Sequence, residues 1–209
     1  MFGRREGAAR GGVVPLDRDR SLVEAARRDP AQFDALYRKY LAQVYAYALY
    51  ELADHHAAED ATERVFMRAL AALPRFAEQA TRDDDPDAST FRVWLFRIAR
   101  NVVANERRTQ RRHPSSSLEL ALGAGLVVAD PDDLAARVAT RDEAAHALRA
   151  LDSLPDDRRR ALVLRFVDEM TTSEIAGVLG RSEGAVRVLI HRGLNAVAKE
   201  LGQDRGSRR

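Results

Sequence analysis

The chain has 209 residues, of which 45% are hydrophobic and 32% are charged, and its formal net charge is +2. This length and apolar content suffice for one large domain or two small ones. The near-balance of charge excludes a uniformly basic protein that coats nucleic acid, so any nucleic-acid binding must rest on local clusters of basic residues. The chain contains no cysteine, which excludes disulfides, thiolate metal ligands and cysteine nucleophiles.

Residues 1–20 are basic and rich in glycine, and they lack the continuous apolar run of a secretory signal. No apolar run in the sequence approaches the roughly 18–20 residues that a membrane-spanning helix needs. We therefore expect a disordered N-terminal tail over residues 1–20, no direct membrane insertion and a cytoplasmic location.

Two amphipathic helices are predicted in the first third of the chain. Apolar residues recur every three or four positions over residues 33–49, after Asp29 and Pro30 as an acidic cap and a proline at the first helical position. A second helix is predicted over residues 57–73, with acids in its first turns. These acids favour the helix dipole, and they also form a candidate acidic patch for a basic protein partner. We expect no metal site at His55 and His56, because adjacent histidines point to different sides of a helix.

The stretch 90–112 joins an aromatic and apolar run to a row of arginines. Phe91, Trp94, Leu95 and Val102 lie at helical spacing and predict a buried face, while six arginines from Arg97 onward stand against a single acid. The stretch is either a core helix with a solvated basic end or a nucleic-acid surface. Residues 77–89, directly before it, have the acidic composition of a solvated loop.

Helical spacing disappears over residues 113–140, where proline, serine, glycine and acids accumulate, and we interpret this segment as an interdomain linker. The second half, residues 141–202, predicts four short helices, followed by a basic tail over residues 203–209. Thr171 or Thr172 caps the third helix, Gly180 ends it and Ser182 caps the fourth. This is the layout of a helix-turn-helix, although an ordinary helical hairpin with a solvated basic side remains open. The fold class is all-α.

Three segments together resemble the bacterial RNA polymerase sigma factors of the extracytoplasmic function group, within the sigma-70 family. They are AEDATERVFMRAL, TFRVWLFRIARN with the arginines that follow it, and LDSLPDDRRRALVLRFVDEMTTSEIAGVLGRSEGAVRVLIHRGL. The resemblance implies two small helical domains joined by a flexible linker: a sigma region 2 bundle over residues 21–112 and a sigma region 4 helix-turn-helix over residues 141–202.

The resemblance also implies a function and its partners. The protein would bind RNA polymerase core, through the clamp of the largest subunit and the flap, and direct promoter recognition and DNA melting, and an anti-sigma factor would regulate it. By position, the polymerase-binding residues are Glu59, Asp60, Glu63 and Phe66. Residues for the minus-ten element are Ser89, Thr90, Phe91, Arg97, Arg100, Asn101, Asn105, Arg107, Arg108 and Arg111. Residues for the minus-thirty-five element are Arg181, Ser182, Glu183, Arg187, His191 and Arg192. The sequence departs from the family's pattern at Arg64, where an acid is usual.

Two other classes of function compete with this interpretation. A one-component helix-turn-helix regulator would bind DNA without polymerase core, but it leaves the stretch 90–112 unexplained. An enzyme is not expected, because the sequence has no Ser-His-Asp, phosphate-loop or metal-ligand spacing. We expect no cofactor, no metal and no small-molecule substrate.

Overall fold

The computed structural model describes residues 17–80, 87–112 and 150–207, and within these ranges every regular element is helical. The first module contains α1 (Arg20–Arg28), η1 (Pro30–Gln32), α2 (Phe33–Leu52), α3 (His55–Ala72), η2 (Leu73–Arg75) and α4 (Phe91–Arg112). The second contains α6 (Asp156–Phe166), α7 (Thr172–Leu179) and α8 (Glu183–Ser207). The predicted all-α class is confirmed for the described residues. The predicted linker and most of the expected tail lie outside them.

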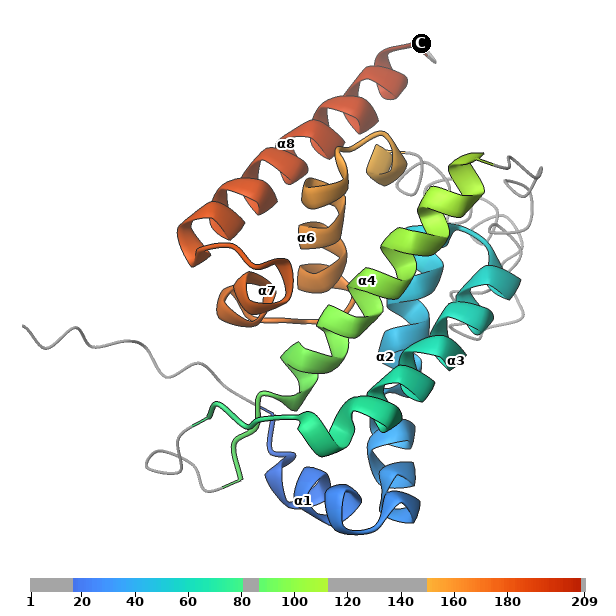
Figure 1. Ribbon diagram of the computed structural model, residues 1–209. Helices are drawn as coiled ribbons and strands as arrows, with labels where there is room; N and C mark the ends of the chain where they lie inside the picture. The colour runs from blue at the N-terminus through green and yellow to red at the C-terminus, as the bar shows by residue number, and fades with distance from the viewer. Residues whose placement is uncertain (1–16, 81–86, 113–149, 208–209) are drawn as a thin grey trace, which may run out of the picture.

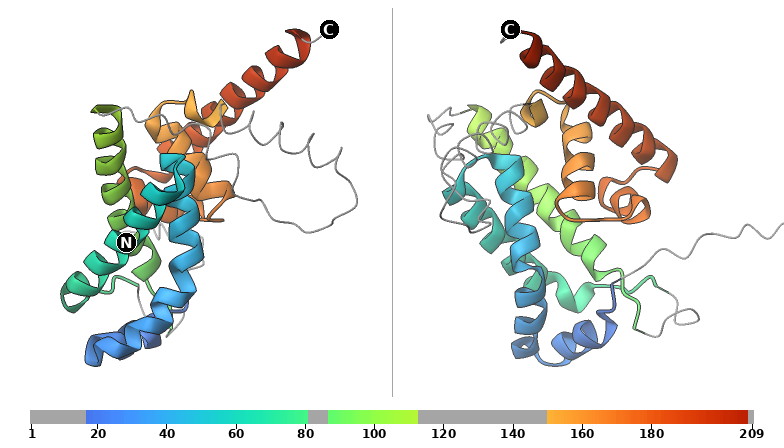
Figure 2. Two further views of the ribbon diagram at one scale, coloured as in Figure 1. Left: turned by 90° about the vertical axis from the view of Figure 1, so that its right-hand side faces the viewer. Right: turned by 180° about the vertical axis from the view of Figure 1, so that it is seen from behind.

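Helix α4 runs diagonally through the molecule, with α2 and α3 on one side and the second module on the other (Figures 1 and 2). This position gives α4 a wider buried face than the sequence predicts. Phe96 and Val103, which the predicted stripe omits, are fully buried, whereas Trp94 is only partly buried. The ring of Trp94 packs on Phe76 and Phe91, at centroid distances of 5.2 and 5.5 Å. The prediction of one narrow buried face on α4 is wrong, because other helices cover α4 from two sides.

Local signals set the ends of the helices in the first module. Asp29 accepts a hydrogen bond from the Ala31 amide, which starts η1 at Pro30 and leads directly into α2. Helix α2 ends at Leu52 and is followed by the capping residue Ala53, whose φ of 53° is unusual for a residue with a side chain. Asp54 then caps α3 by accepting from the Ala57 amide at 2.7 Å. The reversal between α2 and α3 thus needs only two residues.

The last residues of the expected tail are part of the fold. Helix α1 begins at Arg20, and the Arg20 Nε donates to the Ala88 carbonyl at 3.0 Å. Asp19 is fully buried and accepts hydrogen bonds from the Tyr40 hydroxyl and Lys39. Burial and the neighbouring carboxylates raise the pKa of Tyr40, so the hydroxyl stays protonated as a donor. Residues 17–20 therefore clamp the segment that leads into α4.

The predicted helix-turn-helix is confirmed in the second module. Thr171 and Glu174 form a complete capping box at the start of α7. Gly180 ends α7 in the left-handed region, with φ 65°, and the Ser182 hydroxyl accepts from the Ala185 amide at 3.2 Å in the first turn of α8. At Gly193, an added Cβ would stand 3.0 Å from Leu162, so the absence of a side chain lets α6 and α8 approach closely.

Candidate nucleic-acid and protein interfaces

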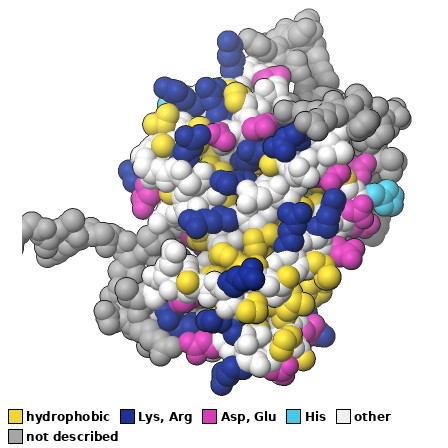
Figure 3. All heavy atoms as spheres, in the orientation of Figure 1, with side chains coloured by type: hydrophobic (Ala, Val, Ile, Leu, Met, Phe, Trp, Pro, Cys, Tyr) yellow, Lys and Arg dark blue, Asp and Glu magenta, His cyan; other side chains and the backbone are white. Residues whose placement is uncertain are grey.

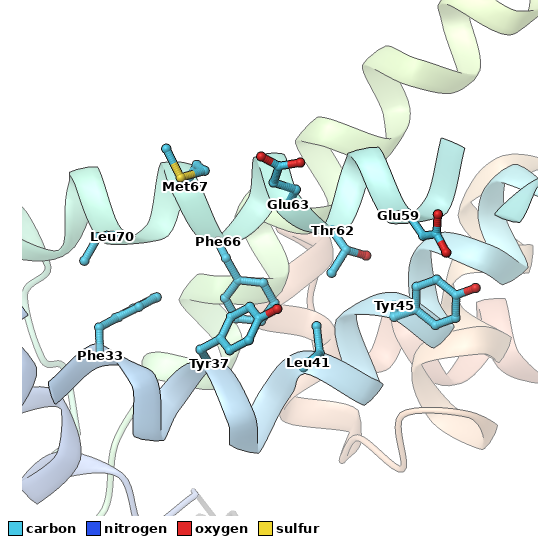
Figure 4. Close-up of a pocket in the computed structure, with 10 residues that line it drawn as sticks. All are labelled: Phe33, Tyr37, Leu41, Tyr45, Glu59, Thr62, Glu63, Phe66, Met67 and Leu70. Atoms are coloured by element: carbon cyan, nitrogen blue, oxygen red, sulfur yellow. The ribbon is translucent and has the colours of Figure 1, made fainter. Parts of the chain in front are cut away.

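An open groove of about 390 Å³ lies between α2 and α3 (Figure 4). Its apolar lining comprises Phe33, Tyr37, Leu41, Phe66, Met67 and Leu70. The Phe66 side chain points from α3 toward Tyr37 on α2, with the two ring centroids 4.8 Å apart. Large apolar side chains at its edge are open to solvent, since Met67 is 63% exposed and Tyr37 is 38% exposed. Hydrophobic side chains accordingly gather in one area of the face shown in Figure 3.

Three of the four residues predicted to bind a protein partner lie together in this groove. Glu59, Glu63 and Phe66 line it, and the two acids are exposed at its rim. Asp60 is also exposed on α3 but does not line the groove. Arg64, the departure from the family pattern, pairs with Glu106 of α4 at 2.9 Å. Its guanidinium therefore holds α3 to α4, which explains a basic residue at this position.

The segment before α4 is organised by an acid that the sequence analysis did not single out. The Glu78 carboxylate accepts hydrogen bonds from both Ser89 and Thr90 hydroxyls, at 2.6 and 2.7 Å, and from the Thr90 amide at 2.7 Å. Burial acts to raise the pKa of Glu78, but these hydrogen bonds outweigh it and lower the pKa below its ordinary value. Ser89 and Phe91 are fully buried, whereas Thr90 is partly exposed. Of these three predicted contact residues, only Thr90 is accessible to DNA in this arrangement. Residues 81–86 of the loop lie outside the described part.

The predicted minus-ten residues of α4 divide into two groups. Asn101, Asn105 and Arg108 are exposed. The exposed Arg97 and the partly buried Arg100 donate to backbone carbonyls of α7, and the partly buried Arg107 pairs with Asp152 at 2.8 Å. The side chain of Arg111 lies outside the described residues. Figure 3 shows Lys and Arg side chains gathered across the middle of one face.

The predicted contacts at the start of α8 form one exposed group. Arg181, Ser182, Glu183, Arg187, His191 and Arg192 all lie on the surface. Arg187 pairs with Glu183 at 3.1 Å, and Arg181 pairs with Asp157 at 2.9 Å. Helix α8 packs inward through Val186, which is fully buried, so its basic side faces out. An exposed helix start that carries arginines can enter a DNA major groove and donate to base edges or phosphates.

A set of polar residues that the sequence does not mark joins the two modules. Arg159 of α6 is buried against Glu51 of α2, with Nη2 and Oε2 3.0 Å apart. Arg92 of α4 pairs with Glu174 of α7 at 3.4 Å and also donates to the backbone carbonyl of Asp168. No sequence pattern marks these residues, because each partner lies in the other half of the chain.

Neither a membrane span nor a metal centre stands out in what the structure describes. None of its helices combines the length and apolar character needed to cross a bilayer. Within residues 17–80, 87–112 and 150–207, no three His, Asp or Glu side chains form a group suited to a metal ion.

Two family models match the chain, one over each module. Sigma-70 region 2 matches residues 36–113, and Sigma-70, region 4, matches residues 147–197. The chain is 30% identical to the ECF RNA polymerase sigma-E factor of Escherichia coli K12, over 88% of this chain and 94% of that protein. It is 32% identical to the ECF RNA polymerase sigma factor BldN of Streptomyces coelicolor, over 88% of this chain but only 66% of that longer relative.

A solved structure extends the match to three dimensions. CnrH in complex with the cytosolic domain of CnrY superimposes with a TM-score of 0.63 at 26% identity, covering 90% of this chain and 99% of that one. The order of the two modules and the helix-turn-helix are consistent with the family models and with these relatives. The chain belongs to the sigma-70 family of RNA polymerase sigma factors, in its extracytoplasmic function group.

Proposed function

We propose that this sigma factor docks on RNA polymerase core through the groove between α2 and α3, and that it presents α4 to the minus-ten element and the start of α8 to the minus-thirty-five element. As a sigma factor it is a DNA-binding transcription initiation factor and not an enzyme. We take its modules to extend over residues 21–112 and 141–202, with the linker boundaries given above. Two tail boundaries are corrected, because residues 17–20 pack with the first module and α8 continues to Ser207. The main support for docking on polymerase is the groove, since it is an apolar surface that nothing in the described chain covers.

The groove has the composition of a protein-binding surface. Contiguous apolar side chains exposed to water and rimmed by polar residues mark interaction sites in soluble proteins. Glu59 and Glu63 lie at its edge, so its partner should combine apolar residues with basic ones. A helical segment of the polymerase clamp that carries such residues fits the groove, because its apolar side chains can lie against Tyr37 and Met67 while its basic residues meet the two acids.

The two DNA-facing surfaces differ in what they offer. The start of α8 presents arginines that can donate two hydrogen bonds to guanine or phosphate. Helix α4 presents Asn101, Asn105, Arg108 and the exposed Arg97, and separation from α7 would also release the hydrogen bonds that Arg97 and Arg100 donate to that helix. Phosphate contacts position the protein, and melted bases supply further contacts. We retain Ser89, Phe91 and Arg111 as proposed minus-ten residues, with Ser89 and Phe91 supporting the shape of the site from within.

We also propose that an anti-sigma factor regulates the protein in the cytoplasm. Support comes from the similar CnrH, whose structure was solved in complex with the cytosolic domain of CnrY. The exposed groove is a surface for which such a regulator can compete with polymerase.

Binding to purified core polymerase, measured with labelled protein in the absence of DNA, tests the docking surface. In Met67→Gln, a polar side chain of similar length replaces one that is 63% exposed. Burying a methionine contributes about 1.5–3 kcal/mol, and loss of the exposed part should cost about 1–2 kcal/mol, which weakens binding about 5- to 30-fold.

Arg68→Gln is the matched control, since Arg68 is exposed and adjacent on the same helix. It should bind core polymerase within about twofold of the wild type. Equal affinities for Met67→Gln and the wild type would remove the groove from the polymerase interface. Tight DNA binding by the protein alone would favour the one-component regulator.

A further inference from the structure

The two modules meet across an interface that uses the same arginines as the proposed minus-ten surface. Arg97 Nε donates to the Gly177 carbonyl at 2.7 Å, and Arg100 Nη1 donates to the Val178 carbonyl at 2.8 Å. Both carbonyls lie in the last turn of α7, where backbone oxygens have no partner within the helix. This end of a helix also carries the negative side of its dipole. The α7 terminus thus presents to α4 the kind of acceptor that a DNA phosphate would present.

Ion pairs fix this contact on either side of the two arginines. Arg159 Nε and Nη2 approach the two Glu51 oxygens at 3.3 and 3.0 Å, and the two side chains are 1% and 0% exposed. Arg92 joins α4 to Glu174 of α7 at 3.4 Å. Leaving one member of such a buried pair without its partner in the interior is strongly destabilising. The pair therefore favours the one arrangement of the two modules in which Arg159 meets Glu51.

The closest approach occurs at Gly177 and Val93. A Cβ added at Gly177 would stand 2.7 Å from Val93 Cγ1, so only glycine permits the separation that lets Arg97 reach the α7 carbonyls. By contrast, the groove between α2 and α3 and the exposed residues of α8 lie outside this contact.

We infer that the isolated protein adopts a closed state in which α7 of the helix-turn-helix module accepts hydrogen bonds from Arg97 and Arg100, so that closure and minus-ten DNA compete for these two guanidinium groups. The polymerase groove stays open in this state, and polymerase can dock before the modules separate. The inference rests on the proposed function for the identity of the DNA surface, while closure itself needs neither polymerase nor DNA. Because the modules belong to one chain, the effective concentration of one module near the other is in the millimolar range, so even a weak interface between them is populated.

A disulfide between Val93→Cys and Gly177→Cys tests this state directly. The ideal Cβ position at Gly177 is 3.9 Å from Val93 Cβ, within the range of about 3.5–4.5 Å that disulfides adopt. The cysteine for valine change also removes the Cγ1 atom that a side chain at position 177 would meet. Since the natural chain has no cysteine, the cross-link in the full-length double variant is unique.

Mild oxidation of the isolated double variant should give a cross-linked monomer within minutes, seen as a mobility shift on non-reducing gels. The cross-linked protein should bind core polymerase within about threefold of its reduced form, but promoter-specific transcription should fall at least tenfold and return on reduction. In each single variant, oxidation should leave the monomer band and the transcription activity the same as in the reduced form of that variant.

Failure to cross-link would overturn closure, and full transcription by the cross-linked protein would overturn the competition. Loss of polymerase binding on cross-linking would overturn the claim that the groove stays open. Should the reduced double variant itself transcribe poorly, Arg159→Gln provides an independent test. Without its ion pair to Glu51, this variant should show a larger radius of gyration in solution scattering and at least fivefold tighter binding of single-stranded minus-ten DNA. An unchanged radius and affinity would count against the closed state, whatever the fate of the proposed function.

Discussion

Asp168 should make the stability of this protein fall as pH rises. Its side chain is 3% exposed and lies near Arg92 of the first module, and neither carboxylate oxygen accepts a hydrogen bond from the residues that the structure describes. Burial raises the pKa of Asp168 from an ordinary 3.8 to about 8, although Arg92 from α4 acts in the opposite direction. The buried Tyr47 of α2 interacts electrostatically with Asp168, and Arg92 acts on both Asp168 and Glu174 of α7. The native protein therefore holds a proton on Asp168 at neutral pH.

The sign and size of the effect follow from proton linkage. Between about pH 4 and pH 8 the native state binds a proton at Asp168 that the unfolded chain has released, so stability decreases as pH rises. The slope approaches about 1.4 kcal/mol per pH unit. Over two pH units the contribution is about 3 kcal/mol. Below about pH 4 both states are protonated and the penalty vanishes.

The substitution Asp168→Asn isolates this contribution, since asparagine keeps the shape and cannot ionise. Urea unfolding of both proteins, followed by helical circular dichroism at pH 5, 6, 7 and 8, gives the difference in their unfolding free energies. We expect the variant to gain about 3 kcal/mol relative to the wild type between pH 5 and pH 7. A difference independent of pH, or one that favours the wild type as pH rises, would refute a neutral buried Asp168.

Three further predictions concern the helix-turn-helix module. Thr171→Ala removes the capping box of α7 and should cost about 1 kcal/mol, or about 2–4 °C in thermal midpoint, whereas an unchanged midpoint would show that the cap is redundant. Gly180→Ala places a side chain at φ 65° and should cost about 1–2 kcal/mol in urea unfolding, and a stabilised variant would show that α7 ends differently. Arg187→Ala should weaken polymerase-dependent binding to a promoter fragment at least fivefold, and it should reduce the salt dependence by about one unit if the contact is to phosphate. Binding that is unchanged at all salt concentrations would remove Arg187 from the interface.

Local signals in the sequence were sufficient to predict three helices and the turn of the second module, while most of the first predicted helix of that half lies outside the described residues. The cap at Thr171, the glycine at position 180 and the serine at position 182 each act within one turn of helix, so their effect does not depend on distant residues. The acidic groove edge on α3 was also predictable, because Glu59 and Glu63 lie on the same side of one helix as Phe66.

The contacts between modules could not be predicted in this way. Glu51 and Arg159 are separated by 108 positions, and each alone has the sequence context of an exposed charge near a helix end. The roles of Arg97 and Arg100 in holding α7 are equally hidden, since an arginine that donates to a carbonyl is spaced no differently from one that binds phosphate. Only the packing of α4 between two layers shows which of its arginines face another helix.

The most direct test of the central claim is transcription in vitro by core polymerase on fragments of the native genome, with every start site mapped. We predict that the protein adds discrete start sites preceded by two shared sequence elements, and that Met67→Gln reduces their yield while Arg68→Gln does not. The absence of new start sites, together with stable DNA binding by the protein without polymerase, would contradict the account.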